Sequence, residues 1–389
     1  MVSVANSITI LMALCVAPNG RWIRHPNETH RAGGPVTTLV ATIGIPSGPL
    51  GGFCFSPNGL RLAIGLAPGA GACLVDTRTR KVQPLAPYVD ATLGRWPHPI
   101  PTPIGDFAFL PGGTNLLGLT TSGALLTWQV ASGKLTQVGR SPSPPTSGYW
   151  SGPFGQIMAL RDGRVALIAP GGIAVRNGPR WAVTAIPPLL RGGIEIDGGR
   201  GFGLLCTAPS GEVIRDASGR IVSRITRPDR WLSVCSSDGG ETLIATTISG
   251  TCEVWRRAAT GRWRRAAALP TRLRRPRLVS CSAGGRYVML WASPRWELLP
   301  YTGRIVSGRG LFRALGKGLM ELLRLSDGVV LRTWSPHAPV TGVQAAAELS
   351  PFRVAFAPSG NKFAVAERGV ARIRVYRIPT NGVRSQAAH

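Results

Sequence analysis

The clearest pattern along the chain is a repeated pair of apolar segments joined by a tight glycine turn. One copy begins at Phe53, turns at Ser56-Pro-Asn-Gly59 and continues through Leu60–Leu66. Further copies begin at Phe107, Ile157, Leu232, Leu278 and Val354, with a degenerate copy at Gly193–Gly199, and their turn glycines are residues 59, 113, 163, 199, 239, 284 and 360. Short apolar segments bounded by turn residues are typical of β-hairpins. The pattern therefore predicts seven hairpin units.

A second hairpin is expected after the first one in each unit. The pairs are Ala124–Trp128 with Lys134–Val138, Gly211–Ile214 with Ile221–Ile225, and Cys252–Trp255 with Trp263–Leu269. The glycine spacings straddle the roughly 40–50 residues of a four-stranded propeller blade. A parallel α/β protein would instead need helices between its strands. We therefore predict an all-β chain that forms a single seven-bladed β-propeller.

Two further segments complete the predicted architecture. Val36–Ile45 is rich in β-branched residues, and we expect it to supply the outer strand of the last blade, whose third strand is Ala371–Ile378. Such an N-terminal strand would close the ring without an exposed sheet edge. Leu311–Leu325 has helical spacing, so we expect a helix there, within an insertion or a broken extra blade near 308–345. The predicted organisation is an N-terminal extension over 1–35, the propeller over 36–380 and a tail over 381–389.

The details of the repeat resemble the WD40-type β-propeller family. The Ser-Pro-Asn-Gly and Ala-Pro-Ser-Gly turns follow Phe55 and Phe356, and third strands end in Val254-Trp255 or Val375-Tyr376. The resemblance covers roughly residues 50–380. The Gly-His and Trp-Asp dipeptides of the family are absent, so its His/Asp hydrogen-bond network is not implied. The stretches Ser236–Trp255 and Ser280–Trp291, together with Trp263, are similar to nucleoporin propellers.

The composition changes this picture mainly through charge. Lys and Arg number 45 against 18 Asp and Glu, which gives a net charge of +27. Such an excess favours an acidic protein, RNA or another polyanion as a partner. With 44% hydrophobic and 16% charged residues the chain is not disordered, and no apolar run reaches the roughly 18 residues of a membrane span. The 7 cysteines form no CxxC pair, which favours an intracellular location in the cytoplasm, nuclear envelope or an organelle over secretion.

The segment from Arg256 to Arg277 is the strongest candidate for a binding site. It has no carboxylate between Glu253 and Glu297, and its arginine forks suit phosphate while Trp263 could stack on a base. The alternative is a solvated outer hairpin with Trp263 packed between blades. The predicted partner-binding or nucleic-acid-binding residues are Arg256, Arg257, Arg262, Trp263, Arg264, Arg265, Arg272, Arg274, Arg275 and Arg277. Changing Arg264, Arg265, Arg274 and Arg275 to Glu is expected to abolish partner binding and to leave the fold intact.

The sequence gives little support for catalysis. The histidines are scattered in predicted loops and tails, at positions 25, 30, 98, 337 and 389. Neither a metal cluster nor a Ser-His-Asp set follows from their spacing, so we predict no enzyme activity, no metal and no cofactor. The favoured function is a non-enzymatic scaffold or interaction subunit of a larger assembly, docking onto an acidic partner or a ribonucleoprotein. The alternatives are a direct RNA- or DNA-binding protein, or a propeller enzyme with a pore site.

Overall fold

The structure is a computed structural model in which the chain divides into two units, Met1–Gly34 and Pro35–His389. It describes residues 37–378 of the second unit with gaps, the longest of which are 91–100, 143–155, 299–311 and 336–351. Regular structure in the described residues consists of β-strands and the short 3₁₀ helix η3 (Asp238–Gly240). None of the described helices has the length and apolar character needed to cross a bilayer.

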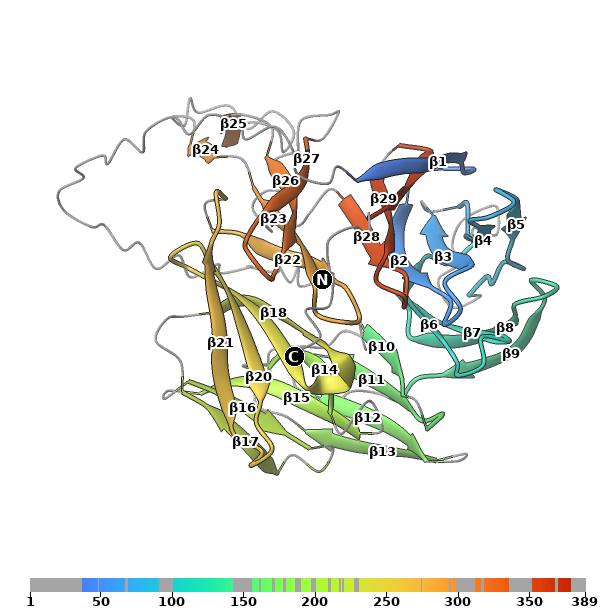
Figure 1. The fold of residues 1–389 in the computed structure, drawn as a ribbon. Coiled ribbons are helices and arrows are strands. Elements are labelled where there is room, and N and C mark those ends of the chain that lie inside the picture. Colours follow the sequence, from blue (N-terminus) through green and yellow to red (C-terminus); the bar gives the residue numbers. More distant parts are fainter. Residues whose placement is uncertain are drawn as a thin grey trace, which may run out of the picture. The chain divides into compact units, whose positions relative to one another are not determined.

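Most strands belong to seven four-stranded antiparallel sheets, each of which is one blade (Figure 1). From the inner to the outer strand, blade one is β2 (Pro49–Phe55), β3 (Arg61–Leu66), β4 (Ala72–Asp76) and β5 (Val82–Pro84). Blade two is β6 (Ile104–Phe109), β7 (Asn115–Thr120), β8 (Ala124–Gln129) and β9 (Leu135–Arg140). Blade three is β10 (Gln156–Ala159), β11 (Val165–Ala169), β12 (Gly172–Asn177) and β13 (Arg180–Ala185).

The other four blades repeat this order. Blade four is β14 (Leu190–Ile196), β15 (Gly201–Ala208), β16 (Gly211–Arg215) and β17 (Ile221–Ile225). Blade five is β18 (Trp231–Ser237), β19 (Thr242–Thr247), β20 (Thr251–Arg257) and β21 (Trp263–Pro270). Blade six is β22 (Arg277–Cys281), β23 (Tyr287–Ala292), β26 (Leu319–Arg324) and β27 (Val330–Trp334). Blade seven is β28 (Phe352–Phe356), β29 (Lys362–Glu367), β30 (Arg372–Arg377) and β1 (Thr38–Gly44).

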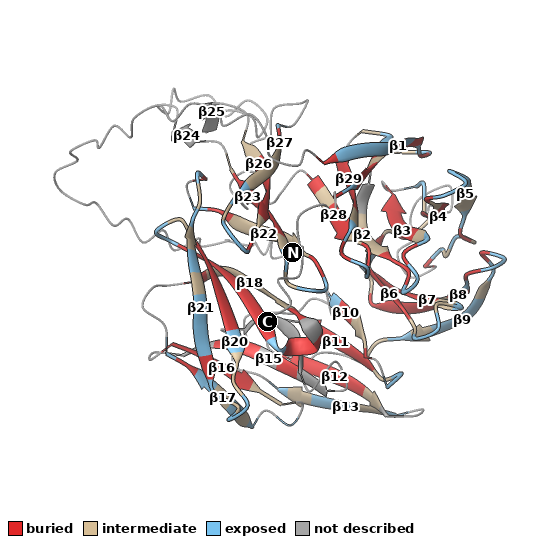
Figure 2. Cartoon of the chain, in the orientation of Figure 1, coloured by how far each residue is buried: buried red, intermediate tan, exposed pale blue. Residues whose placement is uncertain are grey.

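The core of the propeller lies between blades rather than within one central mass. Seven clusters of buried side chains each join two successive blades, and the cluster that contains Ile43, Leu62 and Val375 joins blade seven to blade one. Figure 2 shows the consequence, since second and third strands such as β3 and β20 are largely buried, whereas outer strands such as β9 and β21 are largely exposed. The predicted seven-bladed all-β ring is therefore confirmed.

The turn glycines explain how each inner hairpin closes. In blade one the Gly59 amide donates to the Ser56 carbonyl at 2.8 Å. The φ of Gly59 is 68°, a backbone conformation that residues other than glycine rarely adopt. A positive φ recurs at glycines 113, 163, 239, 285 and 360. The turn glycine of blade six is therefore residue 285 and not residue 284 as predicted, and residue 199 lies outside the described residues. Because strands alternate in direction, the turns after first and third strands share one face of the ring, the turn face.

The N-terminal strand closes the ring as predicted. β1 pairs with β30 in antiparallel register from Thr38 opposite Arg377 to Gly44 opposite Arg372. A hydrogen bond from blade six also holds the start of this strand, because Arg332 Nη1 donates to the Thr37 carbonyl at 3.1 Å. We call this contact the Arg332 latch. The same guanidinium lies over the ring of Tyr376, 4.7 Å from its centroid.

The helix predicted over 311–325 is wrong. Leu319–Arg324 is strand β26, which pairs with β23 and β27 and completes blade six. The strand is buried on both faces, so it reads as a continuous apolar run without the alternation that distinguishes strands in sequence. The extra residues of blade six lie before it, where β24 (Arg295–Leu298) and β25 (Phe312–Leu315) form a separate two-stranded sheet.

Side-chain hydrogen bonds to backbone join the innermost strands of neighbouring blades. Asp106 Oδ2 in blade two accepts from the Ile157 amide of blade three at 3.0 Å. Arg353 Nε in blade seven donates to the Gly51 carbonyl of blade one at 3.2 Å. A Cβ at Gly51 would collide with the Ile104 carbonyl oxygen, so this glycine allows blades one and two to approach closely.

Candidate interaction surface

The predicted arginine segment begins with the outer hairpin of blade five. The Ala258 amide donates to the Arg262 carbonyl and the Gly261 amide to the Ala258 carbonyl, both at 2.8 Å, which closes the turn between β20 and β21. The register sets Arg257 opposite Trp263 and Arg256 opposite Arg264. Arg256, Arg262 and Arg264 are exposed. We call Arg256, Arg257, Arg262 and Arg264 the hairpin surface.

Like charges face each other across this hairpin. Arg256 and Arg264 are cross-strand partners, and directly opposed like charges destabilise a sheet in the absence of a counter-charge. Both residues are exposed, so water screens part of the repulsion. An anion bound between the two guanidinium groups would remove the remainder. The register therefore concentrates positive charge on an exposed part of blade five.

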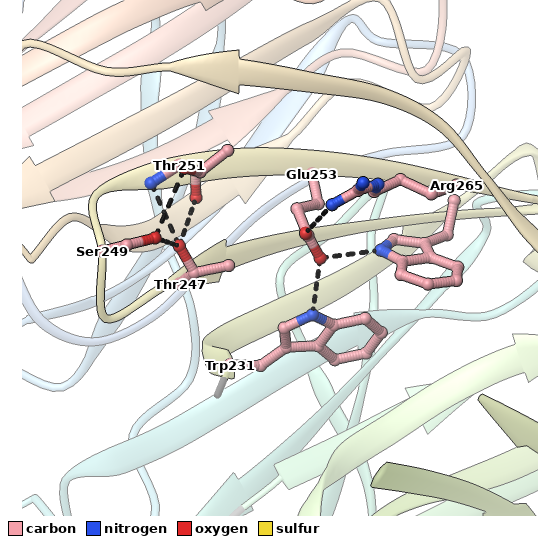
Figure 3. Close-up of polar contacts among 7 residues, drawn as sticks. Trp231, Thr247, Ser249, Thr251, Glu253 and Arg265 are labelled. Atoms are coloured by element: carbon pink, nitrogen blue, oxygen red, sulfur yellow. Dashed lines mark hydrogen bonds and ion pairs between the residues drawn. The ribbon is translucent and has the colours of Figure 1, made fainter. Parts of the chain in front are cut away.

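Two arginines of the segment have carboxylate partners that the sequence did not reveal. Arg265 Nη1 lies 3.0 Å from Oε1 of Glu253, whose side chain is 2% exposed, and Arg257 Nη1 lies 4.0 Å from Glu241 Oε1. Glu253 Oε2 also accepts from the indole nitrogens of Trp231 at 2.9 Å and Trp255 at 3.0 Å (Figure 3). Arg265 therefore belongs to the buried network that holds blade five together.

Trp263 is also structural. Its side chain is 8% exposed and packs in the cluster between blades four and five, together with Ile225 and Trp255. Its indole nitrogen has no hydrogen-bond partner and is covered. Of the two sequence interpretations of Trp263, packing between blades is the one that the structure supports, and stacking on a base is not.

The remaining arginines lie at the opposite end of the blade. β21 runs back along β20, so Arg272, Arg275 and Arg277 follow its far end, on the connection to blade six. There the Thr271 amide donates to the Gly250 carbonyl at 3.0 Å. Arg274 lies outside the described residues. The continuous run of arginines in sequence is therefore divided between the two faces of the ring.

One member of this second group is already near a carboxylate. Burial raises the pKa of Glu321, and the nearby Arg272 guanidinium offsets part of that rise. The Glu321 side chain is 2% exposed, and its Oε2 has no hydrogen-bond partner. Arg272 is therefore better placed to balance a buried charge than to receive a ligand from outside.

A groove of about 690 Å³ with a mixed polar and apolar lining lies between the turn-face ends of blades two and three. Its lining includes Asn115, Thr127, Gln137, Arg164 and Arg176. Arg164 Nε lies 2.8 Å from Asp162 Oδ2, so a carboxylate within the lining offsets part of the positive charge. The groove therefore combines two arginines with a carboxylate of its own.

The part of the chain that the structure describes holds no candidate metal centre. No group of three or more His, Cys, Asp or Glu side chains there could hold a metal ion. The five histidines all lie outside the described residues. Burial raises the pKa of Cys73 to about 12, which keeps this thiol protonated at neutral pH.

Comparisons with known proteins identify the fold. No family model matches the chain, and no curated protein matches it. Among solved structures, the β-propeller domain of Cps50 (Swd1) from Myceliophteria thermophila is similar, with a TM-score of 0.58 and 14% identity over 88% of this chain and 100% of that chain. The Dos1 propeller has a TM-score of 0.57 and 13% identity, over 88% of this chain and 95% of that chain.

At this level of identity the likeness concerns the fold alone. The predicted WD40-type β-propeller architecture is confirmed. The resemblance to nucleoporin propellers, among them ALADIN, is tested by none of these comparisons and stays a prediction.

Proposed function

We propose that this propeller is a non-enzymatic interaction subunit of a larger assembly, and that it docks onto an acidic partner or a ribonucleoprotein through the hairpin surface. The observation that carries the proposal is the cross-strand pairing of Arg256 with Arg264 on an exposed outer hairpin. Similarity of fold supports an interaction role by analogy only, because propellers serve many functions.

Two further features support this proposal. The inner strands are held by blade-to-blade hydrogen bonds, so the hairpin extends from a rigid frame that can present charge with little loss of entropy on binding. The described cysteines are free thiols, which supports our proposal of an intracellular location.

The test is a charge reversal confined to the hairpin surface in the full chain. Partners recovered with the wild-type protein are identified by mass spectrometry, and their recovery is then measured with Arg256→Glu/Arg262→Glu/Arg264→Glu. This variant omits Arg265, because a glutamate there would face the buried Glu253 carboxylate. We expect loss of the main partner with an unchanged melting temperature, since exposed substitutions usually change stability little.

The matched control is Arg140→Glu/Arg224→Glu/Arg372→Glu. These three arginines are exposed and lie toward the ends of their strands that point away from the turn face. The control makes the same change in net charge, so it separates a local site from a general effect of charge. Retention of the main partner by the hairpin variant, or equal loss with the control, would contradict the proposed function.

A further inference from the structure

A second basic cluster lies on the turn face where blade seven meets blade one. We call it the seam cluster, and it comprises Arg78, Arg80, Lys81, Lys362 and Arg377. Lys362 Nζ crosses the seam to donate to Thr77 Oγ1 at 3.2 Å and lies 5.8 Å from the centroid of the Phe55 ring. Thr77 begins the turn that carries the three exposed residues 78, 80 and 81. The two blades thus bring their basic side chains to one place.

The electrostatics of the seam cluster resemble those of the hairpin surface. Lys362 lies directly opposite Arg377 across β29 and β30. Desolvation and the charge of Arg377 lower the pKa of Lys362, an effect that the nearby Asp76 carboxylate only partly offsets. Asp76 Oδ1 is occupied within its own turn, since it accepts from the Arg78 amide at 2.8 Å and the Thr79 amide at 2.7 Å. Positive charge therefore exceeds the local supply of carboxylate.

The blade between the two clusters continues the basic surface. Arg286 follows the turn between β22 and β23 of blade six and is exposed. Its side chain reaches Gly360 of blade seven, where its Nη2 lies 3.5 Å from the position that an added Cβ would take. Basic side chains thus occur on the turn face of blade five, of blade six and at the seam of blades seven and one. This basic surface could not be predicted from the sequence, because its residues are scattered from position 78 to position 377 and come together only when the ring closes.

We propose that a single-stranded nucleic acid follows the turn face from the hairpin surface to the seam cluster, with its phosphates on these arginine and lysine side chains. The inference rests on the proposed function, because it takes the hairpin surface as one end of the site. A nucleic-acid backbone presents an anion at every nucleotide and so suits basic groups spread over several blades, and arginine forks bind phosphate in two-point contacts. A single strand bends to follow a ring, whereas a duplex is stiff over roughly 150 base pairs.

The test measures binding of a fluorescein-labelled single-stranded RNA of roughly 30 nucleotides by anisotropy, from low to moderate salt. The seam variant Arg78→Glu/Arg80→Glu/Lys81→Glu is compared with wild type, with the hairpin variant and with the Arg140→Glu/Arg224→Glu/Arg372→Glu control. Each lost phosphate contact lowers the slope of log affinity against log salt by about 0.7 for a single strand. We therefore expect the seam variant to bind about tenfold or more weakly, with a slope reduced by about two units.

The outcomes separate this inference from the proposed function. Weakening by both the seam and hairpin variants but not by the control supports the site. RNA binding by the seam variant equal to that of the control, or no RNA binding by the wild type at low salt, overturns the inference. In those cases the proposed function still stands if the hairpin variant loses its protein partner. A poly-glutamate competitor that displaces the RNA at equal charge concentration would also overturn the assignment to nucleic acid.

Discussion

Asp106 is a carboxylate whose environment opposes its charge. Burial raises its pKa to about 6, and hydrogen bonds from the Ile157 and Phe107 amides and the charge of Arg353 only partly offset this effect. A raised pKa in the folded state means that protonation favours folding. The stabilising contribution is complete below the unfolded value near 3.8 and is lost as pH rises through 6.

Replacing Asp106 with Asn should remove this pH dependence. A shift of about two units corresponds to at most about 3 kcal/mol between pH 4 and pH 8. Between pH 4 and pH 8 we expect the wild type to lose up to that amount of its free energy of unfolding. We expect Asp106→Asn to lose none of it, as measured by urea denaturation. Parallel pH profiles of the two proteins would contradict the assignment.

Glu253 is a second buried carboxylate, and one of its oxygens has a cation, the Arg265 guanidinium, as a direct partner at 3.0 Å. Glu253→Ala would leave two buried indole N–H groups without an acceptor and Arg265 without its ion pair. We expect a loss of about 3–5 kcal/mol in the free energy of unfolding, and a smaller loss for Glu253→Gln, which keeps an acceptor. Glu241→Ala is the control, because its ion pair with Arg257 is longer and more exposed and should contribute under about 1 kcal/mol. Equal losses for the two alanine variants would be inconsistent with the network.

At the scale of elements, the Arg332 latch on β1 is the most testable feature. Arg332→Ala removes the hydrogen bond to Thr37 and the cation–π contact with Tyr376. We expect a loss of about 2 kcal/mol and faster amide exchange along β1, followed by mass spectrometry. Thr333→Ala, at the exposed neighbouring position, should leave both unchanged. Unaltered exchange in β1 of the Arg332 variant would show that the strand is held by its ladder to β30 alone.

Local pattern predicted most elements because propeller hairpins are local. Alternating apolar residues and a turn glycine lie within one short segment, so the pairs β8 with β9, β16 with β17 and β20 with β21 were all recognisable. β26 was not, since burial on both faces erases the alternation and its leucines and methionine are also good helix formers. The closing strand was predicted by elimination, because the last blade needed a fourth strand.

At the scale of the whole molecule, the sequence predicted the ring but not the distribution of charge on it. The run from Arg256 to Arg277 is continuous in sequence, yet an eight-residue strand separates its two ends. Conversely, Lys362 and the turn at Thr77 are distant in sequence and meet across the seam. Adjacency in a propeller depends on blade order and strand direction, so a basic surface is predictable only after the blades have been counted and oriented.

The pairing of β1 with β30 also determines when the ring can form during synthesis. β1 ends at residue 44 and its partner begins at residue 372, so a ribosome working at roughly 5–20 residues per second completes the partner about 15–65 s later. Throughout that interval the nascent chain carries the unpaired edges of β1, which expose it to wrong pairing. Blade seven is therefore the last of the seven blades to be completed, and a slow step or premature stop before residue 377 leaves every earlier blade in an open ring.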